Sequence, residues 1–447
     1  MKVGLLPFYI KLYEDVVPSR HDSMQANAVR IADLLRQRGL NVVRAPICCL
    51  RPDFAAAVQM FEDEQVDAIV TLHLAYSPSL ESADVLAGTA LPIVVFDTTP
   101  DYEFGFSYGD KVMANHGIHG VQDMCNLLIR NRKPFLITAG PWQHPQIVDR
   151  LLNNIRTAAM AHKMQNLRVG SVGGNFDGMG DFTVPPGTFG MQVIPYTAQP
   201  EPPKTAQEAE IDADRVRFVL GKLSPGVHEQ TVAASLKIRS WLEQDRLDAF
   251  TICFLGITRA DGWATVPFLE ASKAMARRIG YAGEGDVLTA GLHAAIMTAF
   301  PETSFTEMFC PDWAGNRIFL SHMGEINIAL TSQKPLLAER NYIFSDTGNP
   351  AIATGCFRSG KAMLIDLAPG PEQTFTLICA PVTLQAPETP STASNTGWFT
   401  PNSCAVSAFL ENYSRLGGTH HILLSYDADR ESLRDFAHLM QWRFAVI

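Results

Sequence analysis

Short apolar runs alternate with segments of helical periodicity over the first 165 residues. In the segment after Pro145, apolar residues recur every four positions, at Ile147, Leu151, Ile155 and Ala159, which indicates an amphipathic helix. The apolar runs between such segments are predicted strands, at residues 3–7, 41–45, 68–72, 92–96 and 134–138. Strands that alternate with helices are typical of a parallel sheet, so this part of the chain is predicted to be an α/β domain.

The next part of the chain repeats the α/β pattern. A predicted strand at 167–172 runs into the glycine-rich segment 173–180, which lacks the lysine of a P-loop and the GxGxxG order. We interpret this segment as a tightly turned loop, and a substrate contact by Asn175 or Phe176 stays open. Further predictions are helices at 206–222 and 229–245, a strand at 249–255, and a helix at 287–300 with Asp286 as its N-cap.

From about residue 318 the pattern changes to short apolar runs separated by Gly, Pro and Asn. Such runs indicate antiparallel strands in a small barrel or sandwich. The predicted strands are 318–320, 326–330, 351–354, 362–367, 375–379 and 422–425, with a loop at 387–398 and a helix at 432–440. We therefore expect three domains, at 1–165, 166–317 and 318–447.

Composition excludes several classes of function. The chain has 447 residues, of which 47% are hydrophobic and 18% charged, with a formal net charge of −10. No basic stripe is present, so nucleic acid is not an expected partner. No uncharged apolar stretch approaches about 18 residues and the N-terminus has no signal-peptide pattern, so neither a membrane span nor secretion is expected. The eight cysteines form no CxxC pair, which fits a reduced, cytoplasmic protein.

Two carboxylates and two histidines in the C-terminal half are the candidate chemistry. Glu284, Glu307, His322 and His421 each lie at the edge of an apolar run, beside glycine or a small polar residue. Carboxylate oxygen and imidazole nitrogen together suit a divalent metal of intermediate hardness. Their spacing matches no short metal motif, and each residue alone is more often structural. Because neighbouring residues of a strand point to opposite faces, either His420 or His421 is a candidate ligand.

Beyond residue 110 a series of segments matches one known family in the same order along the chain: Ala114–Gly120, Leu136–Gln143, Leu167–Phe176, Ala249–Thr251, Ala282–Asp286, Phe305–Glu307, Ser321–Glu325 and Gly417–His421. Through these segments the chain resembles the L-arabinose isomerase / L-fucose isomerase family. It implies two Rossmann-like or flavodoxin-like α/β domains followed by an antiparallel β-barrel-like domain. The central α/β domain would then carry the two glutamates, and the β-rich domain the two histidines.

The resemblance also implies roles for residues of the site. Its metal ligands correspond to Glu284, Glu307, His322 and His421, and the metal is usually Mn²⁺, with Co²⁺, Mg²⁺ or Fe²⁺ as alternatives. Substrate contacts correspond to His119, His116, Phe176 and Phe254, with His119 supplied by a neighbouring subunit of a trimer or hexamer. The chain departs from the family pattern at several positions: His116 replaces a glutamine, Phe176 a methionine, Leu255 an acid and Met308 an aspartate.

The implied activity is interconversion of an aldose and a ketose of pentose or 6-deoxyhexose type through a cis-enediol. Glu284 and Glu307 would serve both as metal ligands and as the acid–base pair. Two alternatives remain: an epimerase or isomerase of an unusual sugar or sugar acid on the same metal site, and a non-catalytic sugar-binding protein. The retained pair of glutamates favours an enzyme, because binding alone needs no acid–base couple.

Overall fold

The computed structural model describes residues 1–106, 109–385 and 397–447. The chain forms two compact units. The first unit comprises Met1–His162 and Glu431–Gln441, and the second comprises Lys163–Arg430 and Trp442–Ile447. Most of the predicted loop at 387–398 lies outside the described residues. The further division of the second unit into two domains stays a prediction.

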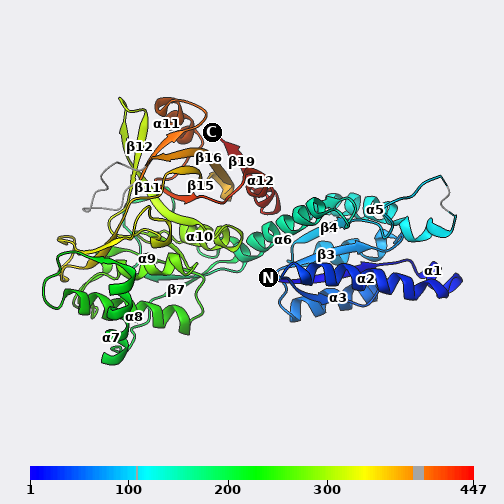
Figure 1. The fold of residues 1–447 in the computed structure, drawn as a ribbon, viewed down its shortest axis with the longest axis horizontal. Coiled ribbons are helices and arrows are strands. Elements are labelled where there is room, and N and C mark those ends of the chain that lie inside the picture. The colour runs from blue at the N-terminus through cyan, green and yellow to red at the C-terminus, as the bar shows by residue number, and fades with distance from the viewer. Residues whose placement is uncertain (107–108, 386–396) are drawn as a thin grey trace. The chain divides into compact units, whose positions relative to one another are not determined.

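A five-stranded parallel sheet forms the centre of the first unit, with strand order β2-β1-β3-β4-β5. Helices lie on both sides of this sheet (Figure 1), as the doubly wound arrangement requires. All five predicted strands are confirmed, as β1 (Lys2–Phe8), β2 (Asn41–Arg44), β3 (Ala68–His73), β4 (Ile93–Asp97) and β5 (Phe135–Ala139). The helices are α1 (Lys11–Val16), α2 (His21–Gln37), α3 (Arg51–Asp63), α4 (Ala83–Gly88), α5 (Gly117–Arg130), α6 (Pro145–Gln165), which runs on into the second unit, and α12 (Arg430–Leu439).

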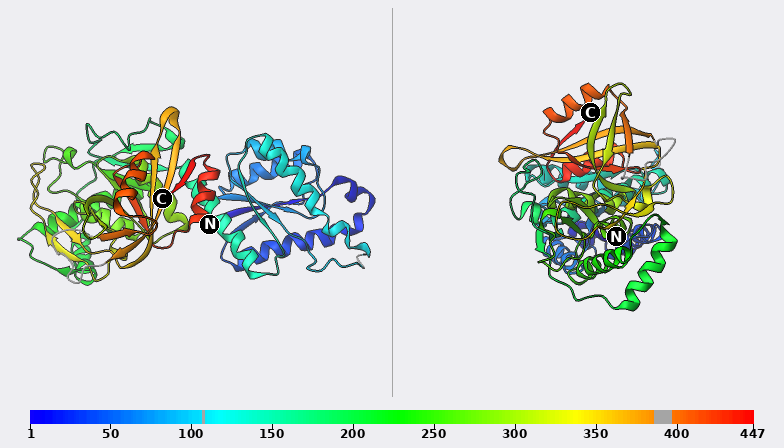
Figure 2. Two further views of the ribbon diagram at one scale, coloured as in Figure 1. Left: turned by 90° about the horizontal axis from the view of Figure 1, so that it is seen from above. Right: turned by 90° about the vertical axis from the view of Figure 1, so that its left-hand side faces the viewer.

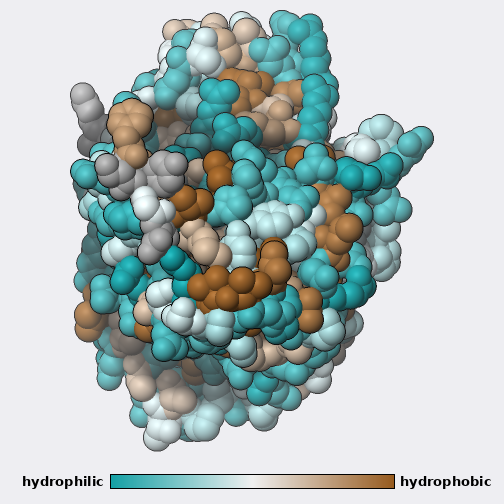
Figure 3. Space-filling model, turned by 90° about the vertical axis from the view of Figure 1, so that its right-hand side faces the viewer, coloured by the Kyte–Doolittle hydropathy of each residue, from teal (hydrophilic) through white to brown (hydrophobic). Residues whose placement is uncertain are grey.

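The hydrophobic core explains why these elements form. Every residue of β3 is buried, as is every residue of β1 after Lys2. Side chains on both faces of the sheet are therefore buried in the core. Helix α2 buries Ile31 and Leu35, which are spaced about one turn apart and so lie on the same face of the helix. The surface carries only small hydrophobic patches interrupted by hydrophilic side chains on the face shown in Figure 3.

The second unit begins with a four-stranded parallel sheet, in the order β10-β9-β6-β7. Its strands are β6 (Arg168–Val172), β7 (Gln192–Pro195), β9 (Ala249–Ile252) and β10 (Gly280–Gly283), and its helices are α7 (Lys204–Arg217), α8 (Val227–Gln244), α9 (Phe268–Ala276) and α10 (Val287–Ala299). A small mixed sheet joins β8 (Val219–Leu220) to β13 (Leu336–Glu339) and β14 (Ala351–Thr354).

A seven-stranded mixed sheet completes the second unit. Its order is β15-β18-β11-β12-β17-β16-β19, and an additional pairing of β15 with β16 joins the first six strands into a closed cycle of hydrogen-bonded neighbours. Figures 1 and 2 show these strands gathered together, with colours from yellow-green to red. They are β11 (Thr303–Asp312), β12 (Arg317–Ser321), β15 (Gly360–Pro369), β16 (Phe375–Gln385), β17 (Gly397–Pro401), β18 (His421–Ser425) and β19 (Arg443–Val446), accompanied by helix α11 (Val406–Arg415).

Three sequence predictions were wrong in their boundaries or type. The helix predicted at 206–222 ends at Arg217, because the chain turns extended at Phe218 to pair β8 with β13. The strand predicted at 249–255 ends at Ile252 and continues into a 3₁₀ turn. The strand predicted at 326–330 is largely a 3₁₀ turn, because the Asn327 side chain accepts a hydrogen bond from the backbone N–H of Ala329 and caps it.

The antiparallel region also begins earlier than the pattern indicated. Strand β11 starts at Thr303, and its first four residues are buried. A continuous apolar or small-residue run of this kind shows no period-two alternation, so hydrophobic patterning does not identify it as a strand. In the described residues, no helix is long and apolar enough to cross a membrane.

Candidate metal centre

Glu284 lies in a tight turn between the end of β10 and the start of α10. Its φ is +63°, in the left-handed region that costs a non-glycine residue energy, and the surrounding contacts hold it there. The backbone N–H of Glu284 donates to the carbonyl of Ile252 at 2.7 Å, and its carbonyl accepts from the N–H of Phe176 at 3.1 Å. The Thr251 hydroxyl donates to the carbonyl of Gly283 and accepts from the N–H of Gly285. Hydrogen bonds between two other segments of the second unit's chain and Gly283, Glu284 and Gly285 therefore hold this turn in place.

The glycine before Glu284 is required by the site itself. A Cβ atom on Gly283 would stand 2.6 Å from Cε1 and 2.8 Å from Nε2 of His322. Such distances are shorter than any real carbon contact, so a side chain at this position would displace the imidazole. The absence of a side chain thus lets His322 approach the Glu284 turn.

Neighbouring strands of the seven-stranded sheet bring the other three side chains together. Glu307 on β11 pairs directly with His421 on β18, and on its other side with Ser321 on β12. His322 follows Ser321 at the end of β12. Directly opposed residues of antiparallel strands have Cβ atoms about 4.5–5.5 Å apart, so this register places Glu307 beside His421.

The four predicted ligands fall into two overlapping groups that share His421. The ligand atoms of Glu307, His322 and His421 lie within 4.8 Å of one another, and so do those of Glu284, His420 and His421. His421 belongs to both groups, and its Nε2 atom is 3.6 Å from a Glu284 carboxylate oxygen. Among the described residues that Nε2 atom is buried and has no hydrogen-bond partner. A buried nitrogen lone pair left unpaired beside two carboxylates fits a metal ligand, so the residues present suit a divalent cation.

Each of the two ligand-type histidines is oriented by a buried carboxylate behind it. Nδ1 of His322 lies 2.8 Å from Glu325, and Nδ1 of His421 lies 3.0 Å from Asp286. The pKa of Glu325 lies below its ordinary value, so this carboxylate is ionised and accepts from Nδ1–H of His322. Burial raises the pKa of Asp286 to about 7, and in its ionised form it accepts from Nδ1–H of His421 in the same way. In the neutral tautomer this leaves Nε2 with its lone pair free for a metal, the arrangement that metal-binding histidines usually show.

The two carboxylates are themselves held in place. Asp286 caps helix α10, because its other oxygen accepts from the N–H of Thr289 at 2.8 Å, as the sequence predicted for the N-cap. Glu325 accepts from the N–H of Gly324 at 2.7 Å and from the hydroxyl of Tyr281 at 2.5 Å. Sequence reasoning found Asp286 only as a cap, and it noted Glu325 only as part of a matching segment.

Aromatic rings enclose the His421 imidazole. Phe182 stacks on it at 5.1 Å with an interplanar angle of 6°, and Phe305 meets it edge-on at 5.0 Å. Phe305 also lies edge-on to His322, at 4.8 Å. This apolar packing fixes both rings and excludes water from one side of the centre.

The electrostatics separate the two glutamates. Burial raises the pKa of Glu307, and although His322 opposes this, the net pKa stays above its ordinary value. Burial also raises the pKa of Glu284, but His420, His322 and His421 outweigh it and bring the pKa below its ordinary value. Burial holds the pKa of His421 well below its ordinary value, so this imidazole is neutral, as a metal ligand must be.

His420 has surroundings different from those of His421. Its Nδ1 lies 2.7 Å from Asp181, and its backbone N–H donates to the same carboxylate at 2.9 Å. Its Nε2 is 3.8 Å from Glu284. Burial lowers the pKa of His420, but Glu284 and Asp181 raise it to about 9. Asp181 was not among the predicted site residues, because nothing in the local sequence signals a partner 239 positions away.

The predicted substrate contacts fall into two sets. Phe176 and Phe254 lie in the second unit, with ring centroids 5.9 Å apart, and Phe176 also touches the Glu284 turn through its backbone. His116 and His119 lie in the first unit, where Nε2 of His116 is 2.8 Å from Nδ1 of His119. These two histidines form a pair of their own beside Tyr76, with ring centroids 6.2 and 6.4 Å from its ring.

Comparison with known proteins finds L-arabinose isomerases among the chain's relatives. The family model described as the L-arabinose isomerase C-terminal domain matches residues 302–443. The L-arabinose isomerase of Aeromonas salmonicida is 25% identical over 418 residues, which cover 86% of this chain and 81% of that protein. That of Mannheimia succiniciproducens is 25% identical over 464 residues, covering 95% and 90%. That of Leuconostoc mesenteroides is 30% identical over 236 residues, about half of each chain.

The fold and the site define an α/β protein with a buried carboxylate–imidazole centre suited to a divalent cation. Residues 302–443 match the L-arabinose isomerase C-terminal domain family, and over most of its length the chain is similar to L-arabinose isomerases, as a divergent relative and an enzyme of the isomerase type.

Proposed function

We propose that this protein is a divalent-metal-dependent aldose–ketose isomerase acting on a small sugar of pentose or 6-deoxyhexose type. The proposal rests on the two overlapping groups Glu307–His322–His421 and Glu284–His420–His421, because together they join two acid–base groups to imidazole nitrogen donors. The residues of the two groups would hold a divalent cation, proposed to be Mn²⁺, which would supply Lewis-acid polarisation of the sugar oxygens. Co²⁺, Mg²⁺ and Fe²⁺ are the alternative ions for the same set of oxygen and nitrogen donors.

The glutamates do the proton chemistry in this proposal. One carboxylate removes the proton from C2 of the aldose, the proton of the O2 hydroxyl passes to O1, and the other glutamate, as a carboxylic acid, returns a proton to C1, so that the sugar passes through a cis-enediol. Their separated environments support a division of labour between them. Each such acid–base contribution is typically worth about 10²–10⁴-fold in rate. His322 and His421, each held by a buried carboxylate, keep the donor set in position without adding negative charge.

The surroundings of the centre support further parts of the proposal. Phe176 and Phe254 would form an apolar wall of the sugar site. His116 and His119 would contact a distal hydroxyl of a sugar held by a neighbouring subunit, in a trimer or hexamer with active sites between subunits. We also propose a cytoplasmic location, and a barrel-like C-terminal domain built on the closed cycle of six strands.

Solvent exchange tests the activity directly. The protein is supplied with Mn²⁺ in D₂O together with pentoses, 6-deoxyhexoses and sugar acids, and deuterium incorporation at C1 or C2 is followed by NMR. We expect exchange with ketose product on at least one neutral sugar, and loss of about 10²-fold or more in Glu284→Gln and Glu307→Gln. Glu411→Gln, an exposed change on α11, serves as the control.

The outcomes separate the alternatives. Exchange with an epimeric product, or with a sugar acid alone, would favour the epimerase or sugar-acid alternative. No exchange on any sugar, with tight sugar binding, would favour a binding protein. Wild-type turnover in both glutamine variants would overturn the proposed mechanism.

A further inference from the structure

A pocket lies in the second unit, at a place that the proposed isomerase chemistry does not use. It has a volume of about 280 Å³. Ligand pockets for drug-sized molecules span roughly 300–1,000 Å³, so this one suits a smaller ligand. Its walls come from the segment before α7, from α7 and α8, and from the loop after β9, and the residues are Glu201, Gln207, Glu229, Gln230, Ala233, Ala234, Lys237, Gly262, Trp263 and Ala264.

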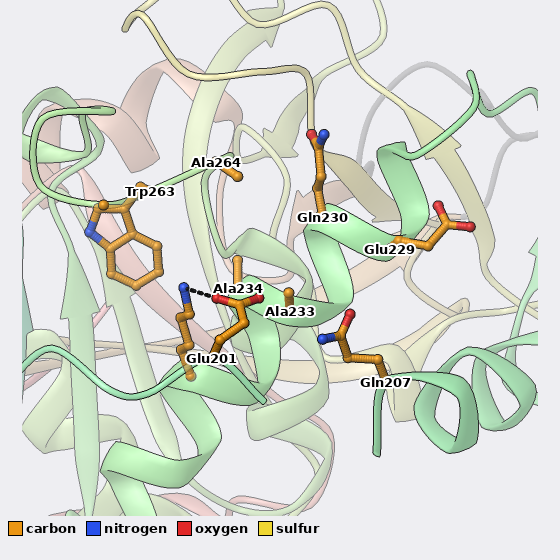
Figure 4. Close-up of a pocket in the computed structure, with 10 residues that line it drawn as sticks. Glu201, Gln207, Glu229, Gln230, Ala233, Ala234, Trp263 and Ala264 are labelled. Carbon is orange, nitrogen blue, oxygen red and sulfur yellow. Dashed lines mark ion pairs between the residues drawn. The ribbon is translucent and has the colours of Figure 1, made fainter. Parts of the chain in front are cut away.

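The pocket combines polar groups with an apolar wall. Figure 4 shows Trp263 at one end and Glu229 and Gln207 at the other, with Ala233 and Ala234 between them. Amides donate and accept hydrogen bonds, and carboxylates accept them, so this set can serve hydroxyl groups, which do both. The indole and the alanines offer a surface for the C–H face of the same ligand.

Most of the wall is held in place without a ligand. The Lys237 ammonium lies 2.6 Å from the Glu201 carboxylate, the ion pair marked in Figure 4. The Gln207 amide donates to the carbonyl of Pro202 at 2.8 Å. Trp263 is buried against Tyr196, with ring centroids 5.0 Å apart. A preformed site binds with a smaller loss of conformational entropy than one that must order itself.

Charge narrows the class of ligand further. Glu201 and Lys237 neutralise each other, and within the described part of the chain Glu229 makes no ion pair. The pocket therefore has one surplus negative charge, which disfavours phosphorylated or carboxylated ligands. We propose that this pocket is a second, non-catalytic binding site for a small neutral polyol, meaning a free monosaccharide or sugar alcohol.

The test uses the full-length protein stripped of metal with EDTA, so that the metal centre does not dominate binding. Xylitol and arabitol are the probes, xylitol 5-phosphate and choline are the comparison ligands, and binding is measured by saturation-transfer NMR and by Trp fluorescence. We expect binding of the neutral polyols with little binding of the phosphate or of choline. Because sugar alcohols cannot be isomerised and no metal is present, this result is independent of the proposed isomerase activity.

Two variants locate the binding. Ala233→Met on α8 fills the pocket with a good helix former, and should abolish polyol binding while leaving turnover of the metal-loaded enzyme unchanged. Glu229→Ala should weaken polyol binding about tenfold, the effect of one lost charged hydrogen bond. Ala209→Met, an exposed change on α7 outside the pocket, is the matched control.

The outcomes decide the proposal. Binding that is lost in Ala233→Met and kept in Ala209→Met supports it. Absence of polyol binding, polyol binding unaffected by Ala233→Met, or choline or the phosphate binding more tightly than the polyols would overturn it.

Discussion

The buried carboxylate of Glu325 should set the metal affinity of the centre through His322. Glu325 is 2% exposed, and it uses one oxygen for His322 and the N–H of Gly324 and the other for the hydroxyl of Tyr281. In Glu325→Gln the amide oxygen can keep the first two bonds, and its NH₂ can donate to the tyrosine hydroxyl. The hydrogen-bond geometry then survives, and only the negative charge is lost.

Magnitudes follow from this geometry. Hydrogen bonds to charged groups contribute about 1.5–3 kcal/mol, against about 0.5–1.5 kcal/mol for neutral ones. The difference of about 1–1.5 kcal/mol predicts an Mn²⁺ affinity about 5- to 13-fold weaker in Glu325→Gln. Glu325→Leu removes all acceptors and leaves the His322 Nδ1–H buried without a partner. Loss of such a supporting group typically costs 10- to 100-fold in metal affinity, so the leucine variant should fall in the upper part of that range.

Isothermal titration of Mn²⁺ into the metal-free proteins measures the effect. Circular dichroism and thermal melts of the metal-free forms establish that each variant is folded. Glu411→Gln, which changes an exposed carboxylate on α11, should bind Mn²⁺ as the wild type does. If both Glu325 variants fold and bind Mn²⁺ with wild-type affinity, the reasoning about the orienting carboxylate is refuted.

Three further predictions follow from the same structure. Gly283→Ala should push the His322 imidazole away and weaken Mn²⁺ binding at least tenfold. Gly88→Ala, where nothing lies within 4 Å of the added Cβ, should leave Mn²⁺ binding unchanged. Equal Mn²⁺ affinities of the two variants in titration would contradict this. Removing the metal should lower the melting temperature, since a ligand at 100 times its Kd stabilises by about 2.7 kcal/mol, and His421→Ala should lose this response to added Mn²⁺ in thermal melts. Burial raises the pKa of Glu210, but Arg239 and the buried Lys273 hold it well below its ordinary value.

Because its folded pKa is depressed, Glu210 contributes stability that is present above its unfolded pKa and is lost as the pH falls below about 4.5. Glu210→Gln should therefore destabilise the protein at pH 7 by about 1.5–3 kcal/mol, since Lys273 and Arg239 lose one charged partner but keep Asp214 and Glu270, and should lose less further stability at acid pH than the wild type. Urea denaturation at pH 7, 5 and 4 measures both effects, and parallel pH profiles for the two proteins would argue against it.

Much of the fold was predictable because its signals are local. The apolar runs of the first five strands and the periodicity after Pro145 report burial on both faces of a sheet and on one face of a helix. Asp286 was recognisable as a cap because a cap acts on the helix that follows it. Strand β11 and the end of α7 were missed, because there pairing with distant strands overrides local propensity.

The candidate ligands could be named from the sequence, whereas their supports could not. The sequence pattern placed all four at the ends of elements, which holds for Glu284, His322 and His421 but not for Glu307, which lies inside β11. Only the tertiary structure decided that Asp286 and Glu325 orient the two imidazoles, that Asp181 holds His420, and that Gly283 must lack a side chain. The physical reason is that local propensity and burial are written in neighbouring residues, whereas an orienting hydrogen bond or a steric allowance depends on which distant segments meet in space.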